Sequence, residues 1–184
     1  MPDTKSFLEP SQNIDTYDVR IVRQANLLIG YCTEQHTIVE RFFQYVRDHI
    51  TYYPQGKPSK ASEALVCGIG NSKAKACLLA AMCRIAGIPA GISIQQVQDM
   101  KSTVPDKKNS LKRHAIVRVY LEGQWLKLDP SLDWRFAYGR DFIAPSFNGN
   151  QDVLLPEKDW NGEDNYKIIE ESAIYNDIPS CAFE

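Results

Sequence analysis

Apolar residues recur at helical spacing through the first part of the chain. The spacing predicts one helix over Ile14–Gly30 and a second from Thr33, as N-cap, to about His49. Proline then interrupts the pattern, so we expect a short extended piece at Ile50–Pro54 and a short helix or turn at Pro58–Leu65.

The segment from about Ser72 to Ala86 is apolar or small on almost every side after its first turn. A helix of that composition is buried in the centre of a domain. Gly87 suits the position after the helix, and Pro89 prevents its continuation.

The pattern then changes to the alternation typical of strands. Ile92–Val97 is one strand candidate, and His114–Leu121 with Gln124–Asp129 forms the clearest hairpin, joined at Glu122–Gly123. The stretch between them, Met100–Ser110, is polar and rich in lysine, so we expect a surface loop.

Beyond Asp133 the pattern weakens into aromatic-rich loops. The elements together predict an α+β fold with helices packed on an antiparallel sheet. The length of 184 residues predicts one domain, residues 1–184, with residues 1–13 as a flexible arm.

Composition narrows the function classes. Hydrophobic residues make up 43% and charged residues 24% of the chain, as in ordinary globular domains, and the net charge of −2 argues against nucleic acid or a membrane as partner. No apolar run reaches the roughly 20 residues of a membrane-spanning helix, and Met1–Lys5 has none of the apolar core of a signal peptide.

The cysteine pattern bears on the cellular compartment of the protein. The five cysteines, an odd number at irregular spacing, form no zinc pattern with the three histidines. We therefore expect reduced thiols in a cytoplasmic protein that needs no metal and no cofactor, and we expect Cys77 and Cys83 to be buried in the central helix.

The hairpin places two polar residues together. With a two-residue loop, Leu121 faces Gln124 and Ile116 faces Asp129, so His114 and Asp129 share the more polar face as diagonal neighbours about 7 Å apart at the backbone. A register slip of one residue would separate them. A carboxylate that fixes an imidazole tautomer is what a thiol enzyme needs.

The central helix also carries a motif. The sequence runs Gly68-Ile-Gly-Asn-Ser-Lys, then Arg84, then Gly87-Ile-Pro-Ala90. It resembles the nucleophile helix of the transglutaminase-like superfamily, and in that alignment Ser72 stands where the family carries its catalytic cysteine. His114 opening a strand, and Asp129 before proline after the following strand, resemble the family's second and third catalytic residues.

The resemblance covers about residues 50–133. It implies a transglutaminase-like, papain-like core with catalytic residues Ser72, His114 and Asp129. It also implies a protease, amidase or acyltransferase that attacks an amide or peptide carbonyl through an acyl-enzyme. The backbone N–H of residue 72 would be one oxyanion donor, with the second unassigned, and Lys73 and Lys75 would add positive charge near the nucleophile.

Serine fits this chemistry poorly, because its hydroxyl is protonated at neutral pH. Ser72 either replaces a native cysteine and silences the site or is the natural residue, and Ser72 or Asn71 could also simply cap the helix. Two other functions stay open. One is a peptide-binding module that has lost its nucleophile, and the other is a phosphate cradle at the glycine loop, although the full P-loop pattern is absent.

Overall fold

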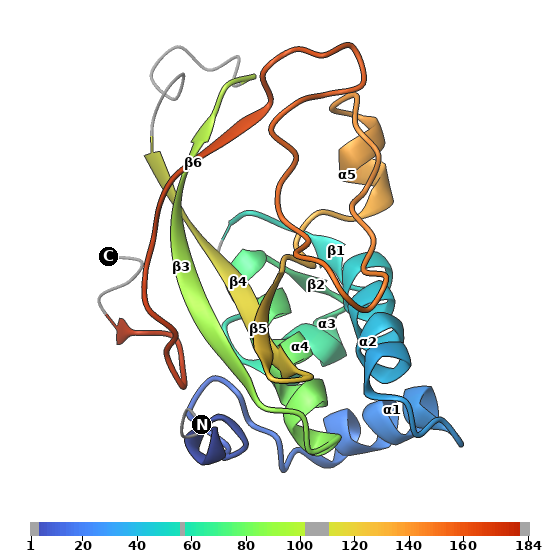
Figure 1. The fold of residues 1–184 in the computed structure, drawn as a ribbon. Helices are drawn as coiled ribbons and strands as arrows, with labels where there is room; N and C mark the ends of the chain where they lie inside the picture. The colour runs from blue at the N-terminus through green and yellow to red at the C-terminus, as the bar shows by residue number, and fades with distance from the viewer. Residues whose placement is uncertain (1–3, 56–57, 102–110, 181–184) are drawn as a thin grey trace.

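The computed structural model describes residues 4–55, 58–101 and 111–180. Helices gather on one side of a four-stranded antiparallel sheet, as Figure 1 shows, which confirms the predicted α+β fold. The strands, in the order in which they pair, are β5 (Gln124–Leu128), β4 (Leu111–Leu121), β3 (Ala90–Asp99) and β6 (Tyr166–Glu171). Most of the loop predicted over Met100–Ser110 lies outside the described residues.

Three helices precede the central one: α1 (Val19–Ile29), α2 (Gln35–His49) and α3 (Ala61–Cys67). The first begins later than the apolar spacing predicts, because Asp18 caps it by accepting a hydrogen bond from the Arg20 N–H. The second begins one residue after Glu34, so Thr33 is not its cap.

The central helix α4 (Ser72–Ile85) is buried along nearly its whole length, as predicted. Its N-cap is Asn71, whose Oδ1 accepts a hydrogen bond from the Ala74 N–H at 3.0 Å. Ser72 is therefore the first residue of the helix and not its cap.

The glycine loop before α4 forms a strand that the sequence did not predict. β2 (Ile69–Gly70) pairs in parallel with β1 (Thr51–Tyr52). Gly68 ends α3 with a φ of 65°, and a Cβ at Gly70 would lie 3.2 Å from the Cβ of Ala74. The two glycines thus bring the chain close against the first turn of α4. The carbonyl of Gly68 accepts a hydrogen bond from the Thr51 N–H, and that of Gly70 accepts one from the Tyr53 N–H.

The hairpin has the predicted register. Leu121 pairs with Gln124 and Tyr120 with Trp125. Positive φ angles of 47° at Glu122 and 86° at Gly123 are those of a type I′ turn, whose twist matches the flanking strands. The alternate residues of β4 and β5 that were expected to face the core are buried, namely Ala115, Val117, Val119, Leu121, Leu126 and Leu128.

The region after Asp133 contains two elements where only loops were expected, α5 (Trp134–Tyr138) and β6. Asp133 caps α5 by accepting hydrogen bonds from the N–H groups of Arg135 and Phe136. The pairing of β6 with β3 shifts register between Gln96 and Val97.

Residues 4–13 are held against the body of the protein rather than extending as a free arm. They contain a short 3-10 helix (Lys5–Phe7), and the Phe7 ring lies 5.1 Å from the ring of Trp125. Arg84, near the end of α4, donates hydrogen bonds to the carbonyls of Glu9, Ala90 and Asn176. The arginine of the motif therefore joins both ends of the chain to the central helix.

Candidate functional site: a helix N-terminus beside a His–Asp pair

Ser72 lies where α4 meets the open part of β4. It is buried, and its Oγ accepts a hydrogen bond from the Ala115 N–H at 3.3 Å. The pairing of β5 with β4 ends at Leu128, opposite Val117, so Ala115 lies beyond the end of β5 on β4. The loss of the strand partner leaves this part of β4 open to the first turn of the helix.

His114 and Asp129 are in direct contact. The Nε2 of His114 lies 2.7 Å from the Oδ2 of Asp129, and both residues are buried. Oδ1 of Asp129 accepts a hydrogen bond from the Ser131 N–H at 2.9 Å, and the Oγ of Ser131 lies 3.5 Å from the same Nε2. The neighbours that the hairpin register predicts are therefore in hydrogen-bond contact.

The ionisation of Asp129 fixes the state of the imidazole. Burial raises the pKa of Asp129, but the His114 charge and the hydrogen bonds from His114 and Ser131 outweigh it and hold the pKa below its ordinary value. An ionised carboxylate only accepts hydrogen bonds, so Nε2 of His114 donates. Nδ1 is then the nitrogen that can take up a proton.

Ser72 and His114 line the same hollow of about 430 Å³, which we call the cleft. The cleft is lined by Tyr52, Pro54, Gln55, Asn71, Ser72, Lys112, Arg113 and His114. It lies between the start of α4 and the start of β4, with the β1 segment at its side. Two of the predicted site residues, Ser72 and His114, thus line one cleft, and the third, Asp129, contacts His114.

A second hollow, of about 170 Å³, meets the cleft at Tyr52, Pro54, Lys112 and His114. We call it the side pocket. Its other lining residues are Val97, Asp99, Leu132, Phe136, Leu155 and Tyr166. His114 therefore lines both spaces.

Lys75 does not face the nucleophile position. It is fully buried, and its Nζ donates hydrogen bonds to the carbonyls of Arg47 (2.9 Å) and Ile50 (2.6 Å) at the end of α2. Burial lowers the pKa of its amine to about 7. Lys75 thus joins the start of α4 to the end of α2, and its amine interacts electrostatically with Asp129 and Asp133.

The cysteines divide by burial. Cys77 and Cys83 are fully buried in α4, as predicted, and burial raises the pKa of both thiols. Cys67 is exposed and Cys32 half-buried, while Cys181 lies outside the described residues. No group of three His, Cys, Asp or Glu side chains suited to a metal ion occurs within residues 4–55, 58–101 and 111–180.

Sequence reasoning missed three contributors to the site. Ser131 supports Asp129 through an Asx turn, which the Asp129-Pro130-Ser131 order could have signalled. Asp133 accepts a hydrogen bond from the Tyr52 N–H at 2.9 Å and so attaches β1 to the start of α5. Tyr52 itself lines both hollows, and no local sequence signal exists for its long-range contact with Asp133.

The N-terminus of α4 lies against the β4–β5 hairpin that carries His114 and Asp129. This arrangement of helix and antiparallel sheet is an α+β fold with a transglutaminase-like core. The family model of the transglutaminase-like superfamily matches residues 23–130, and the chain belongs to that superfamily. No curated protein sequence matches it. None of the described helices is long and apolar enough to cross a membrane.

Solved structures share this fold. A candidate cysteine protease from Cytophaga hutchinsonii aligns over 100% of this chain and 60% of its own, with a TM-score of 0.59 and 18% identity. The periplasmic domain of TgpA from Pseudomonas aeruginosa aligns over 73% of this chain and 48% of its own, with a TM-score of 0.52 and 21% identity. This chain thus spans 60% or less of the length of these two structures.

Proposed function

We propose that the site is that of a transglutaminase-like thiol enzyme that acts on an amide or peptide carbonyl, with Ser72 in place of the catalytic cysteine. The observation that carries the proposal is the 2.7 Å contact between His114 and Asp129, in a cleft that His114 shares with the first residue of α4. The proposed catalytic residues are Ser72, His114 and Asp129.

The chemistry for a cysteine at position 72 follows from this geometry. The thiol gives its proton to Nδ1 of His114, and the thiolate gains from the positive end of the α4 dipole. The thiolate attacks the carbonyl carbon, the C–N bond breaks, and the imidazolium returns its proton to the leaving amine. Water or an amine, deprotonated by His114, then releases the acyl group and restores the thiol.

The backbone supplies part of the transition-state stabilisation. Ser72 is the first residue of α4, so its N–H is among those without an acceptor inside the helix. It would donate to the oxyanion that forms on the substrate carbonyl. Asn71 accepts a hydrogen bond from the Ala74 N–H, three residues further on, and leaves the N–H of residue 72 free for this role.

Serine at this position makes the chain inactive or very slow. A hydroxyl next to a single imidazole is a weaker nucleophile than a thiolate, because almost none of it is ionised at neutral pH. The Oγ of Ser72 also accepts a hydrogen bond from the Ala115 N–H, which holds it at the edge of β4. The site keeps its base and its carboxylate but lacks the reactive atom.

The alternative is a peptide-binding module of the same fold that has naturally lost its nucleophile. Ser72 itself supports this alternative, because a serine occupies the position at which the family carries its catalytic cysteine. In both cases the partner is a peptide or another amide-containing molecule, and a cytoplasmic location stays a prediction.

The test is reactivity after Ser72→Cys. The variant and the unchanged chain are treated with iodoacetamide and an activity-based thiol probe, and labelled sites are assigned by mass spectrometry. We expect one new, fast-labelling thiol at position 72, and loss of the fast labelling when His114→Ala is added. The exposed Cys67 serves as the internal reference for an ordinary thiol.

If the introduced thiol labels no faster than Cys67, the His–Asp pair does not activate it, and the binding module is the better account. Incubation of the reactive variant with a peptide ester then separates hydrolysis from transfer. Hydrolysis yields free acid alone, whereas an acyltransferase yields a new amide when an amine is added.

A further inference from the structure

The side pocket belongs to a second hydrophobic cluster, separate from the main core under α4. Val97, Leu132, Leu155 and Tyr166 are buried members of this cluster, and Phe136 and Tyr52 pack against it. A hollow of about 170 Å³ remains open against this cluster. The space opens beside His114, which lines it.

The size of the pocket limits what it can hold. An apolar cavity of about 150 Å³ in a protein interior accepts a benzene molecule. A space of about 170 Å³ therefore fits one aromatic ring or one branched aliphatic side chain, and it is too small for a cofactor. The rings of Tyr52 and Phe136 both line the pocket, and they pack edge to face on one another with their centroids 5.1 Å apart.

The charged residues at the pocket do not favour a cation. Asp99 lines it, but Arg140 pairs with both carboxylate oxygens, at 2.6 Å and 3.1 Å, and Lys112 lies 3.4 Å from one of them. Burial raises the pKa of Asp99, but these cations outweigh it and lower the pKa, so the carboxylate stays ionised and paired. A lysine or arginine side chain would find its anion already bound by two cations.

We infer that the side pocket is the specificity subsite of the cleft and takes an aromatic or branched aliphatic side chain of the substrate, next to the carbonyl that lies at Ser72. The inference rests on the proposed function for the identity of the substrate as a peptide or amide. It goes beyond that function by assigning a chemical class to one side chain. Apolar area removed from water supplies the affinity.

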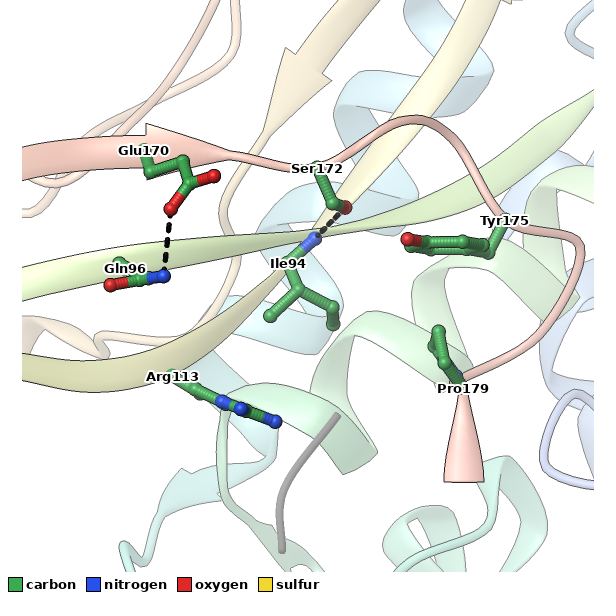
Figure 2. A pocket seen from close by; sticks show the side chains of 7 residues that line it. All are labelled: Ile94, Gln96, Arg113, Glu170, Ser172, Tyr175 and Pro179. Carbon is green, nitrogen blue, oxygen red and sulfur yellow. Dashed lines mark hydrogen bonds between the residues drawn. The ribbon is translucent and has the colours of Figure 1, made fainter. Parts of the chain in front are cut away.

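Another hollow, shown in Figure 2, serves as the comparison. It measures about 310 Å³, and Glu170 pairs with Gln96 in its lining. Its lining contains none of Ser72, His114 and Asp129, and it is bordered by exposed polar side chains. It shares only Arg113 with the cleft, whereas the side pocket shares four residues with it, His114 among them.

The experiment uses the protein with Ser72 unchanged, because a serine at this position keeps a bound amide from reacting. Binding of N-acetyl-phenylalaninamide, and of its leucine, glycine, lysine and glutamate analogues, is measured by NMR titration. Burial of the side chain predicts binding of the phenylalanine and leucine amides about tenfold or more tighter than the glycine amide. The largest methyl shifts are expected at Leu155, Leu132 and Val97.

Two variants fill the side pocket and one fills the comparison hollow. Leu155→Phe and Leu132→Phe should each abolish the preference for the apolar side chains, whereas Gln96→Phe should leave it unchanged. Circular dichroism shows whether each variant folds. The methyl shifts of the unchanged chain test the inference even if neither filling variant folds.

Several results would overturn the inference. They are equal binding of the glycine amide, tightest binding of the lysine or glutamate amide, or an apolar preference that persists in both folded filling variants. Reactivity of Ser72→Cys with no apolar preference would remove the subsite and leave the proposed enzyme. An apolar preference without that reactivity would keep the subsite and remove the enzyme.

Discussion

The Nε2 of His114 lies 2.7 Å from the Oδ2 of Asp129, across two adjacent strands whose pairing ends just before this contact. Asp129 is the first residue after β5, and His114 lies three residues before Val117, the last partner of β5 on β4. Because the strands separate there, both side chains can turn towards one another while the edge of β4 stays open to α4. The end of one strand thus creates both the His–Asp pair and the room for Ser72.

Replacement of Asp129 by asparagine should lower reactivity without unfolding the protein. Asp129→Asn keeps an oxygen for the Ser131 N–H but no longer provides an anion for the imidazole. In the Ser72→Cys background we expect the alkylation rate at neutral pH to fall by about 10²–10⁴-fold, because His114 loses the carboxylate that makes it an effective general base. Rates equal to those of Ser72→Cys alone would mean that Asp129 has only a structural part.

Lys75 should make stability depend on pH in the alkaline range. Its pKa is lowered from 10.5 to about 7 in the folded chain, so between these values the unfolded chain holds the extra proton. The free energy of unfolding should therefore rise with pH above about 7, by at most about 1.4 kcal/mol per pH unit. Below about pH 7 the contribution of Lys75 should not change with pH.

Lys75→Met should remove that rise. Urea unfolding of the unchanged chain and of Lys75→Met is measured at pH values between 6 and 10, about one unit apart. At each pH it gives the difference between the two proteins in the free energy of unfolding. The difference should grow with pH in favour of the unchanged chain. A difference that stays constant over the range would show that the folded amine titrates at its ordinary pKa.

Arg84 should matter for stability and not for reactivity. Arg84→Met leaves the carbonyls of Glu9, Ala90 and Asn176 without their donor, and we expect a loss of about 2–4 kcal/mol in the free energy of unfolding. Arg20→Met is the matched control, because Arg20 is largely exposed and its pair with Asp18 should contribute little to stability. Equal losses in the two variants would contradict the role assigned to Arg84.

Gly70 should tolerate no side chain. Gly70→Ala places a Cβ 3.2 Å from the Cβ of Ala74 and 3.3 Å from the Cγ of Lys75, so the first turn of α4 must move, at a cost of about 1–3 kcal/mol. The same change should slow alkylation in the Ser72→Cys background. Gly139→Ala is the control, since its nearest neighbour lies at an ordinary 3.5 Å. Equal stability of the two alanine variants would contradict the close packing at Gly70.

The parts of the fold that local pattern determines could be predicted from the sequence. Turn residues at Glu122 and Gly123 fix the hairpin register, and that register alone brings His114 beside Asp129. The small and apolar residues of α4, with Gly87 and Pro89 after them, give the central helix and its end. These signals lie within a few residues of the structure that they specify.

The parts that depend on distant contacts could not be predicted. β6 pairs with β3 although residues such as Gln95 and Glu171 are 76 positions apart in the sequence. The register shift between Gln96 and Val97 also breaks the strict alternation that a sequence pattern needs. The two-residue strands β1 and β2 are too short for any periodicity. Lys75 looks like a surface cation in a first helical turn, and only the position of the end of α2 shows that it is buried.

The measurement that tests the central claim most directly is the pH dependence of iodoacetamide alkylation at position 72 in Ser72→Cys. An activated thiol beside His114 and the N-terminus of α4 should reach half of its maximal rate at least about one unit below the ordinary thiol pKa of about 8.5, and return towards that value when His114→Ala is added. A profile centred near the ordinary value, and unchanged by His114→Ala, would contradict the account of a thiol-enzyme site.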